Sequence, residues 1–152
     1  MHSLNEHSLI VAFTVTATEN IPDCGRLRQL LSYAAEQEGL SGELGVWLCL
    51  DEEIADLHLR FMDVPGATDV ITFADDQSDG GYLGDIAVSV QTAAVQANDA
   101  GHPVEREVAY LCLHGLLHIA GFDDLDDHER TRMFERQDAL LTAFEQEFPG
   151  DW

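Results

Sequence analysis

The stretch from Val104 to Ala120 constrains the fold more than any other part of the chain. It combines helical spacing with an apolar run made of Tyr110, Leu111, Cys112, Leu113, Leu116, Leu117 and Ile119. A helix that is apolar on most sides belongs inside a domain, so we expect it to be the central helix. His114 and His118 are four residues apart and share one face of that helix, so both imidazoles can reach a single ion.

A glycine after the second histidine predicts a third ligand. Gly121 can adopt the left-handed conformation that ends a helix, and the chain can then turn back toward the imidazoles. Asp124 follows three residues later. The spacing H-x(3)-H-x(2)-G-x(2)-D therefore predicts a metal site formed by His114, His118 and Asp124. Without the glycine and the carboxylate, two partly buried histidines bonded to backbone carbonyls would be the simpler interpretation.

The ligand types favour one zinc ion (Zn2+), although imidazole and carboxylate also suit nickel, iron or manganese. Three protein ligands leave a coordination position for water, as in hydrolytic sites. His128 is the alternative to Asp124 as third ligand. It falls within the capping box Asp126-x-x-Glu129 of the last predicted helix. Reaching the ion would break that cap at a cost of about 1 kcal/mol.

Three sequence blocks resemble the YbeY family. The run from His114 to Asp124 is similar to the family signature H-G-x-L-H-x-x-G-Y-D-H, with Phe122 in place of tyrosine and Asp124 in place of the third histidine. The segment 68–73, TDVITF, resembles the family's P-T-D-V-L-S-F, with Ala67 in place of proline. The segment 83–89, LGDIAVS, resembles L-G-D-I-x-I-S.

This resemblance implies a metal-dependent, single-strand-specific endoribonuclease that acts in ribosomal RNA maturation and ribosome quality control. The partners it implies are single-stranded RNA, ribosomal RNA and the small ribosomal subunit, and no DNA is expected. It also implies an arginine in the loop before the T-D-V block that holds phosphate. Arg60 is the arginine of this block, but the family position, counted back from Thr68, carries Met62. A solvated arginine at the end of a helix is the alternative for Arg60.

Other polar residues are expected to have structural roles. Asp69 can brace the start of its strand, and Asp85 can fix the loop before its own strand. Asp123 can accept a hydrogen bond from a ligand imidazole. His58 and His102 are expected at the surface rather than in a metal site.

The remaining pattern predicts an α+β fold. Strands are predicted at 8–16, 43–50, 70–73 and 85–88, and helices at 23–39, 51–61, 89–100 and 104–120 and from Asp126 onward. Asp23 and Asp51 are expected as helix caps. Phe134, Leu141, Phe144 and Phe148 are expected on one face of the last helix. The result is a small mixed sheet of about four strands packed with helices around the metal-bearing helix.

The length of 152 residues and the apolar content of 45% fit a single domain covering 1–152. No membrane span or basic leader is visible, so we expect a cytoplasmic protein. Three scattered cysteines in apolar surroundings suggest reduced core thiols.

The charge argues against strong non-specific binding to nucleic acid. Twenty-nine acidic residues face seven arginines and no lysine, which gives a formal net charge of −22. Such a chain repels phosphate backbones at long range. An acidic, lysine-free surface also suits a high-salt cytoplasm, where screening removes much of the repulsion.

Two alternative functions stay open from the residues. The spacing of the ligands is also the outline of a metzincin-like metalloprotease, whose H-E-x-x-H motif supplies a glutamate base. Here that position is Gly115, so the base is missing. The second alternative is a non-catalytic ribosome-assembly or metal-storage protein.

Overall fold

A computed structural model describes residues 8–75 and 81–152. Four strands and five helices follow one another in this part of the chain: β1 (Leu9–Val15), α1 (Cys24–Glu38), β2 (Gly42–Cys49), α2 (Asp51–Met62), β3 (Val70–Ala74), β4 (Tyr82–Ser89), α3 (Val90–Ala100), α4 (Val104–Ile119) and α5 (Asp127–Glu147). Every predicted element is present, and β4 begins three residues earlier than expected. Most of the polar loop between β3 and β4, residues 76–80, lies outside the described residues.

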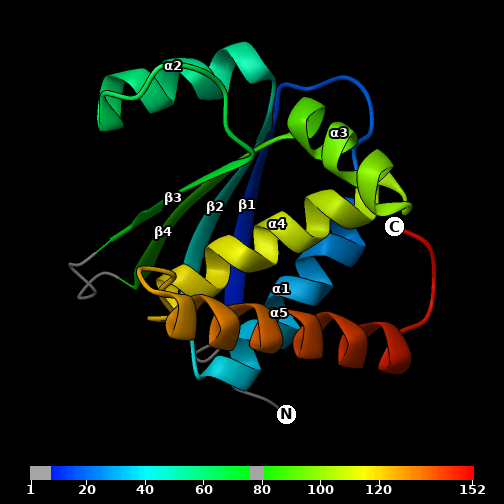
Figure 1. The fold of residues 1–152 in the computed structure, drawn as a ribbon. Helices are drawn as coiled ribbons and strands as arrows, with labels where there is room; N and C mark the ends of the chain where they lie inside the picture. The colour runs from blue at the N-terminus through cyan, green and yellow to red at the C-terminus, as the bar shows by residue number, and fades with distance from the viewer. Residues whose placement is uncertain (1–7, 76–80) are drawn as a thin grey trace.

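The strands form one mixed sheet in the order β1-β2-β4-β3. β1 and β2 run parallel, as do β2 and β4, while β3 is antiparallel to β4 and forms an edge of the sheet. In Figure 1, α4 crosses the sheet with α1 and α5 packed beside it, while α2 lies at the β3 edge. The predicted α+β architecture is confirmed.

The helix ends follow local chemistry, with one correction. The Asp23 carboxylate accepts from the backbone N–H of Arg26 at 3.1 Å, and Gly39 ends α1 in the left-handed conformation, both as predicted. Asp51 was expected to cap α2 but is its first residue, and Leu50 is the N-cap. The Glu53 carboxylate accepts from the backbone N–H of Leu50 at 2.9 Å, which leaves Asp51 to accept from neighbouring hydroxyl groups on Ser89 and Thr92.

The main core lies between the sheet and α1, α4 and α5, with α4 as its centre. Nine of the sixteen residues of α4 are buried. Gly115 lies against Ile86 of β4, and a Cβ added to the glycine would be only 2.8 Å from Ile86 Cγ2. The absence of a side chain at Gly115 therefore lets the metal-bearing helix pack directly on the sheet.

A smaller core lies on the opposite face, under α2. Cys49, Ile54, Ile71 and Ala87 are buried there. On β2, Leu44, Val46 and Leu48 face the main core, and Trp47 and Cys49 face the other side, as the alternation predicted. The described cysteines are free thiols, as expected.

The prediction for the last helix is partly wrong. Phe144 and Leu141 are buried, but Phe134 is 38% exposed because it lies about 80° around the helix from Phe144. Met133 takes its place on the buried face. Within the described ranges, no helix combines the length and the apolarity needed to cross a bilayer.

Candidate metal centre

The C-terminal half of α4 positions the two predicted histidines. His114 and His118 lie one turn apart on the face that is left partly open, and their ring centroids are 4.8 Å apart at an interplanar angle of 87°. Leu113, Leu116 and Leu117 are fully buried on the other sides of the same turns and fix the rotation of the helix. The two imidazoles therefore lie together on the partly open face of α4.

The turn after α4 brings the carboxylate back to the imidazoles. Gly121 has φ of +106°, and the backbone N–H of Phe122 donates to the carbonyl of Leu117 at 3.0 Å, which reverses the chain. Asp124 Oδ2 then lies 3.7 Å from His118 Nε2. One donor atom from each of His114, His118 and Asp124 lies within 4.8 Å of the others, so the three predicted ligands are brought together. Two imidazoles and one carboxylate at this spacing fit a zinc-type site with open positions.

Gln137 of α5 holds the imidazole of His114. Its Nε2 donates to the carbonyl of Tyr110 at 3.0 Å, so its Oε1 faces His114 Nδ1 at 2.8 Å. An amide oxygen only accepts, so Nδ1 carries the proton and Nε2 keeps its lone pair for a metal. Gln137 was not among the predicted site residues, although a polar residue between Met133 and Leu140 on an apolar helix face indicates a buried hydrogen-bonding role.

The surroundings of His114 favour its neutral form. Burial lowers the pKa of this histidine, and the neighbouring His118 lowers it further, while the hydrogen bond that His114 donates to Gln137 and the carboxylates of Asp124 and Asp69 oppose the shift. Phe134 stacks on the ring with centroids 5.5 Å apart. A neutral imidazole is the form that binds a metal, so the site is prepared for a cation.

A cavity of about 400 Å³ opens beside these three groups. Its walls are the C-terminal part of α2, the outer edge of β3 and the metal-ligand candidates; the polar lining includes His58, Thr68, Asp69, Thr72 and Asp124. Leu57 and Phe61 of α2 face the opposite side of the sheet, whereas His58 and Met62, one position on, face this cavity. α2 therefore lies across the edge of the sheet at β3 and contributes side chains to both faces of the sheet.

Comparisons with known proteins identify the family. A family model described as "Endoribonuclease YbeY" matches residues 17–145. The chain belongs to the YbeY family. Proteins named endoribonuclease YbeY are 38% identical in Macrococcus caseolyticus, over 78% of this chain and 83% of the relative, and 41% identical in Thermobifida fusca, over 67% and 72%. A solution structure from Thermotoga maritima has a TM-score of 0.64 at 24% identity, covers 92% of this chain and 91% of its own, and supports the fold.

Arg60, the arginine predicted from the YbeY resemblance, does not line the cavity. Its guanidinium pairs with Asp56 at 3.0 Å and lies over the ring of Phe61, and its side chain is 63% exposed. Met62, at the position where the family is expected to carry arginine, does line the cavity. His58 was expected at the surface, but it also lines the cavity. His58 and Met62 are four residues apart and share one face of α2, so the position of Met62 would have indicated that of His58.

The two aspartates near the YbeY-like motifs, Asp69 and Asp123, have different hydrogen-bond partners. Asp69 braces the start of β3, since its carboxylate accepts from the backbone N–H of Val70 at 2.8 Å and from Gln96 Nε2 at 3.1 Å. The Asp123 carboxylate accepts from the backbone N–H of Asp124 at 2.8 Å, and no bond to an imidazole is seen for it among the described residues. Its predicted role as acceptor for a ligand ring is therefore unsupported.

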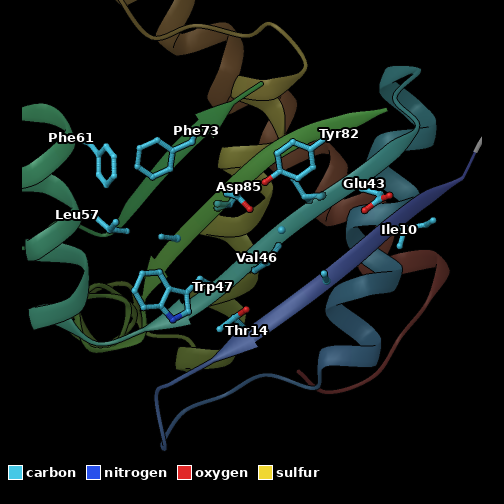
Figure 2. A pocket seen from close by; sticks show the side chains of 15 residues that line it. Ile10, Thr14, Glu43, Val46, Trp47, Leu57, Phe61, Phe73, Tyr82 and Asp85 are labelled. Carbon is cyan, nitrogen blue, oxygen red and sulfur yellow. Dashed lines mark hydrogen bonds between the residues drawn. The ribbon is translucent and has the colours of Figure 1, made fainter. Parts of the chain in front are cut away.

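A second, larger cavity of about 580 Å³ lies on the opposite face of the sheet (Figure 2). Trp47, Leu57, Phe61 and Phe73 line one end. At the other end, the Tyr82 hydroxyl donates to Asp85, so this carboxylate links two residues of β4. Asp85 is thus separated from the metal-ligand candidates by the sheet. Most of the loop that Asp85 was expected to fix, residues 76–80, lies outside the described residues.

Proposed function

We propose that this protein is a metal-dependent endoribonuclease that cleaves single-stranded RNA at His114, His118 and Asp124 and acts in ribosomal RNA maturation. One observation carries the proposal: three metal-binding groups converge at the rim of a cavity in a chain whose family is described as endoribonuclease. The relatives with 38% and 41% identity bear the same name. On this proposal the chain is one catalytic domain, residues 1–152, working with the small ribosomal subunit in the cytoplasm.

Zinc is the ion we propose, since two imidazoles and a carboxylate suit it. When bound, it would act as a Lewis acid toward a phosphoryl oxygen and would make water more acidic. Two neutral rings and one carboxylate leave a net charge of +1 around a divalent ion, against +2 for three histidines. We therefore expect weaker Lewis acidity, and a higher pH optimum, than in a three-histidine site.

The outer edge of β3 offers a place for one RNA strand. Ser89 N–H donates to the Asp69 carbonyl at 2.9 Å, and Asp75 N–H donates to the Leu83 carbonyl at 3.0 Å, so the odd-numbered residues of β3 bond to β4. The N–H groups of Thr72 and Ala74 point away from β4 by alternation, and both residues line the cavity. No other described strand pairs with this edge, so these donors can reach a phosphate or a base.

The charge distribution means that RNA affinity must come from the site itself. Among the described residues, carboxylates pair with Arg60, Arg106, Arg130 and Arg136, four of the seven arginines. Few cations are left to release counterions from an RNA backbone, so binding should depend only weakly on salt concentration.

Packing argues against a metalloprotease. The general base of that class would stand at Gly115, where even a Cβ would approach Ile86 to within 2.8 Å. A glutamate side chain could be placed there only by displacing the Ile86 side chain or by moving α4 away from the sheet.

The experiment compares Asp124→Ala with His128→Ala. His128 is exposed in the first turn of α5 and lies outside the three-residue group. We expect Asp124→Ala to lose most bound zinc and RNA cleavage, and His128→Ala to keep both, measured by metal analysis and cleavage of a labelled single-stranded RNA with and without chelator. The opposite order would show that His128 is the third ligand. Full cleavage by metal-free protein would refute the proposed function.

A further inference from the structure

Most of the titratable groups that line the cavity already have another role. Phosphodiester cleavage by a hydroxyl group requires that its proton be removed as its oxygen attacks, and a positioned side chain commonly does this. Gly115 cannot, because it has no side chain. Asp69 lines the cavity, but its two carboxylate oxygens already accept from Val70 N–H and Gln96 Nε2. Asp124 belongs to the proposed metal site.

His58 is oriented in a way that leaves one nitrogen available. It lies in the last two turns of α2, is partly buried, and lines the cavity next to Met62. Its Nδ1 lies 3.0 Å from the carbonyl oxygen of Gly66, in the loop that follows the helix. A carbonyl oxygen cannot donate, so Nδ1 carries the hydrogen, and in the neutral ring Nε2 has a free lone pair.

We propose that His58 is the general base of the RNA cleavage reaction, acting through Nε2; the inference rests on the function proposed above. Among the described residues that line the cavity, His58 is the remaining titratable group once the metal site is set aside together with Asp69, whose two carboxylate oxygens hold the start of β3 and the side chain of Gln96. The bond to Gly66 fixes both the tautomer and the ring, which a proton-transfer residue requires and a solvated histidine does not.

The step balances as follows. The oxygen of an attacking hydroxyl, from water or from the ribose 2′ position, forms a bond to phosphorus while its proton passes to His58 Nε2. The bond between phosphorus and the leaving ester oxygen breaks, and the electron pair of that bond goes to the oxygen. The leaving oxygen takes up a proton from solvent, and His58 returns its own proton to solvent, so the ring begins the next cycle neutral.

The first test removes Nε2 and keeps the bond to Gly66. In His58→Asn, the side-chain amide occupies the position of Nδ1 and can still donate to the carbonyl, whereas nothing replaces Nε2. We expect kcat for a single-stranded RNA to fall about 10²- to 10⁴-fold, with KM and zinc content near wild type. His128→Asn is the matched control, since His128 is an exposed histidine outside the cavity, and it should leave kcat unchanged.

A second pair of variants separates proton transfer from simple phosphate contact. His58→Glu and His58→Gln have nearly the same shape and both reach the Nε2 position, but only glutamate can accept a proton. A general base at this site predicts that the Glu variant is at least about tenfold faster than the Gln variant. A hydrogen-bond donor to phosphate predicts the reverse, because glutamine donates and glutamate repels the anion. Zinc analysis of each variant excludes an effect through the metal.

The proposal is overturned if His58→Asn keeps kcat within about threefold of wild type, if its loss follows zinc content or KM, or if the Gln variant is faster than the Glu variant. Each of these outcomes leaves wild-type cleavage intact and so concerns His58 alone. A wild-type protein that holds zinc yet does not cleave RNA would instead refute the proposed function, and the role of His58 with it.

Discussion

Replacing Gln137 with methionine should weaken metal binding without touching a ligand. Gln137 is fully buried and makes two bonds, from His114 Nδ1 at 2.8 Å and to the Tyr110 carbonyl at 3.0 Å. Methionine has a similar volume, but its sulfur is a weak hydrogen-bond acceptor. The His114 ring therefore loses the partner that fixes its tautomer. Loss of such a partner reduces metal affinity about 10- to 100-fold, or roughly 1.4–2.7 kcal/mol. Two lost bonds should lower metal-free stability by about 1–3 kcal/mol.

The assay for Gln137→Met is competition for zinc with a chromophoric chelator, together with urea unfolding of the metal-free protein. Leu140→Met is the matched control, because Leu140 is also buried on α5, is 3% exposed, and has no bond to His114. We expect the control to cost less than about 1.5 kcal/mol in stability and to bind zinc as wild type does. If Gln137→Met binds zinc within twofold of wild type, the ring does not depend on Gln137 and our reading of the tautomer is wrong.

Three further predictions concern single sites. If Arg60 contributes to phosphate binding, Arg60→Ala should raise KM for RNA several-fold, and Asp56→Ala, which frees the guanidinium, should lower it; equal KM values in all three proteins would exclude the role. Gly115→Ala should cost about 1–3 kcal/mol in urea unfolding, because the new Cβ meets Ile86 at 2.8 Å, and an unchanged midpoint would contradict that packing. The hydrogen bond that Arg106 donates to Glu145 lowers the pKa of this carboxyl group in the folded protein. The pair therefore stabilises the fold at pH values above the ordinary carboxylate pKa of about 4.3, and this stabilisation is lost as the pH falls through the lower pKa of the folded state. Glu145→Gln should therefore be less stable than wild type at pH 7 and approach it at low pH, and a constant difference across pH would refute the linkage.

Local patterns predicted most of the fold because each depends on neighbours in the chain. Three such patterns are found in the structure: the alternation of buried and exposed residues in β2, the N-cap at Asp23 and the helix-ending glycine at position 39. Each depends on residues that are only a few positions apart in the chain. The failure at Asp51 has a similar local origin. An aspartate and a following helix suggested a cap, but the carboxylate is used by hydroxyl groups on β4 and α3, and no local rule contains those groups.

The parts of the site that the sequence did not reveal come from distant elements. His114, His118 and Asp124 lie within eleven residues, so spacing alone was enough to bring them together. Gln137 is 23 residues from His114 and reaches it only because α5 packs on α4. His58 lies on α2, which meets the cavity only because β3 is an edge strand and α2 crosses its outer side. Orientation of ligands and proton transfer therefore depend on tertiary packing, whereas ligand identity does not.

The contact between α4 and β4 connects the local spacing of the ligands with the tertiary packing around them. α4 approaches β4 so closely that Ile86 occupies the space that a side chain at position 115 would need, and this contact places the histidines at the level of the β3 edge. The same contact removes the position from which a glutamate base could act on the metal-bearing helix. A proton acceptor must then come from an element across the cavity, and α2 presents His58 there with one nitrogen already bonded to Gly66. Ile86→Ala should cost about 2–5 kcal/mol by itself, but the loss in the double variant with Gly115→Ala should be smaller than the sum of the two single losses, because the shorter side chain at position 86 removes the contact that the new Cβ would make. Additive losses would mean that the two residues do not set the distance between helix and sheet.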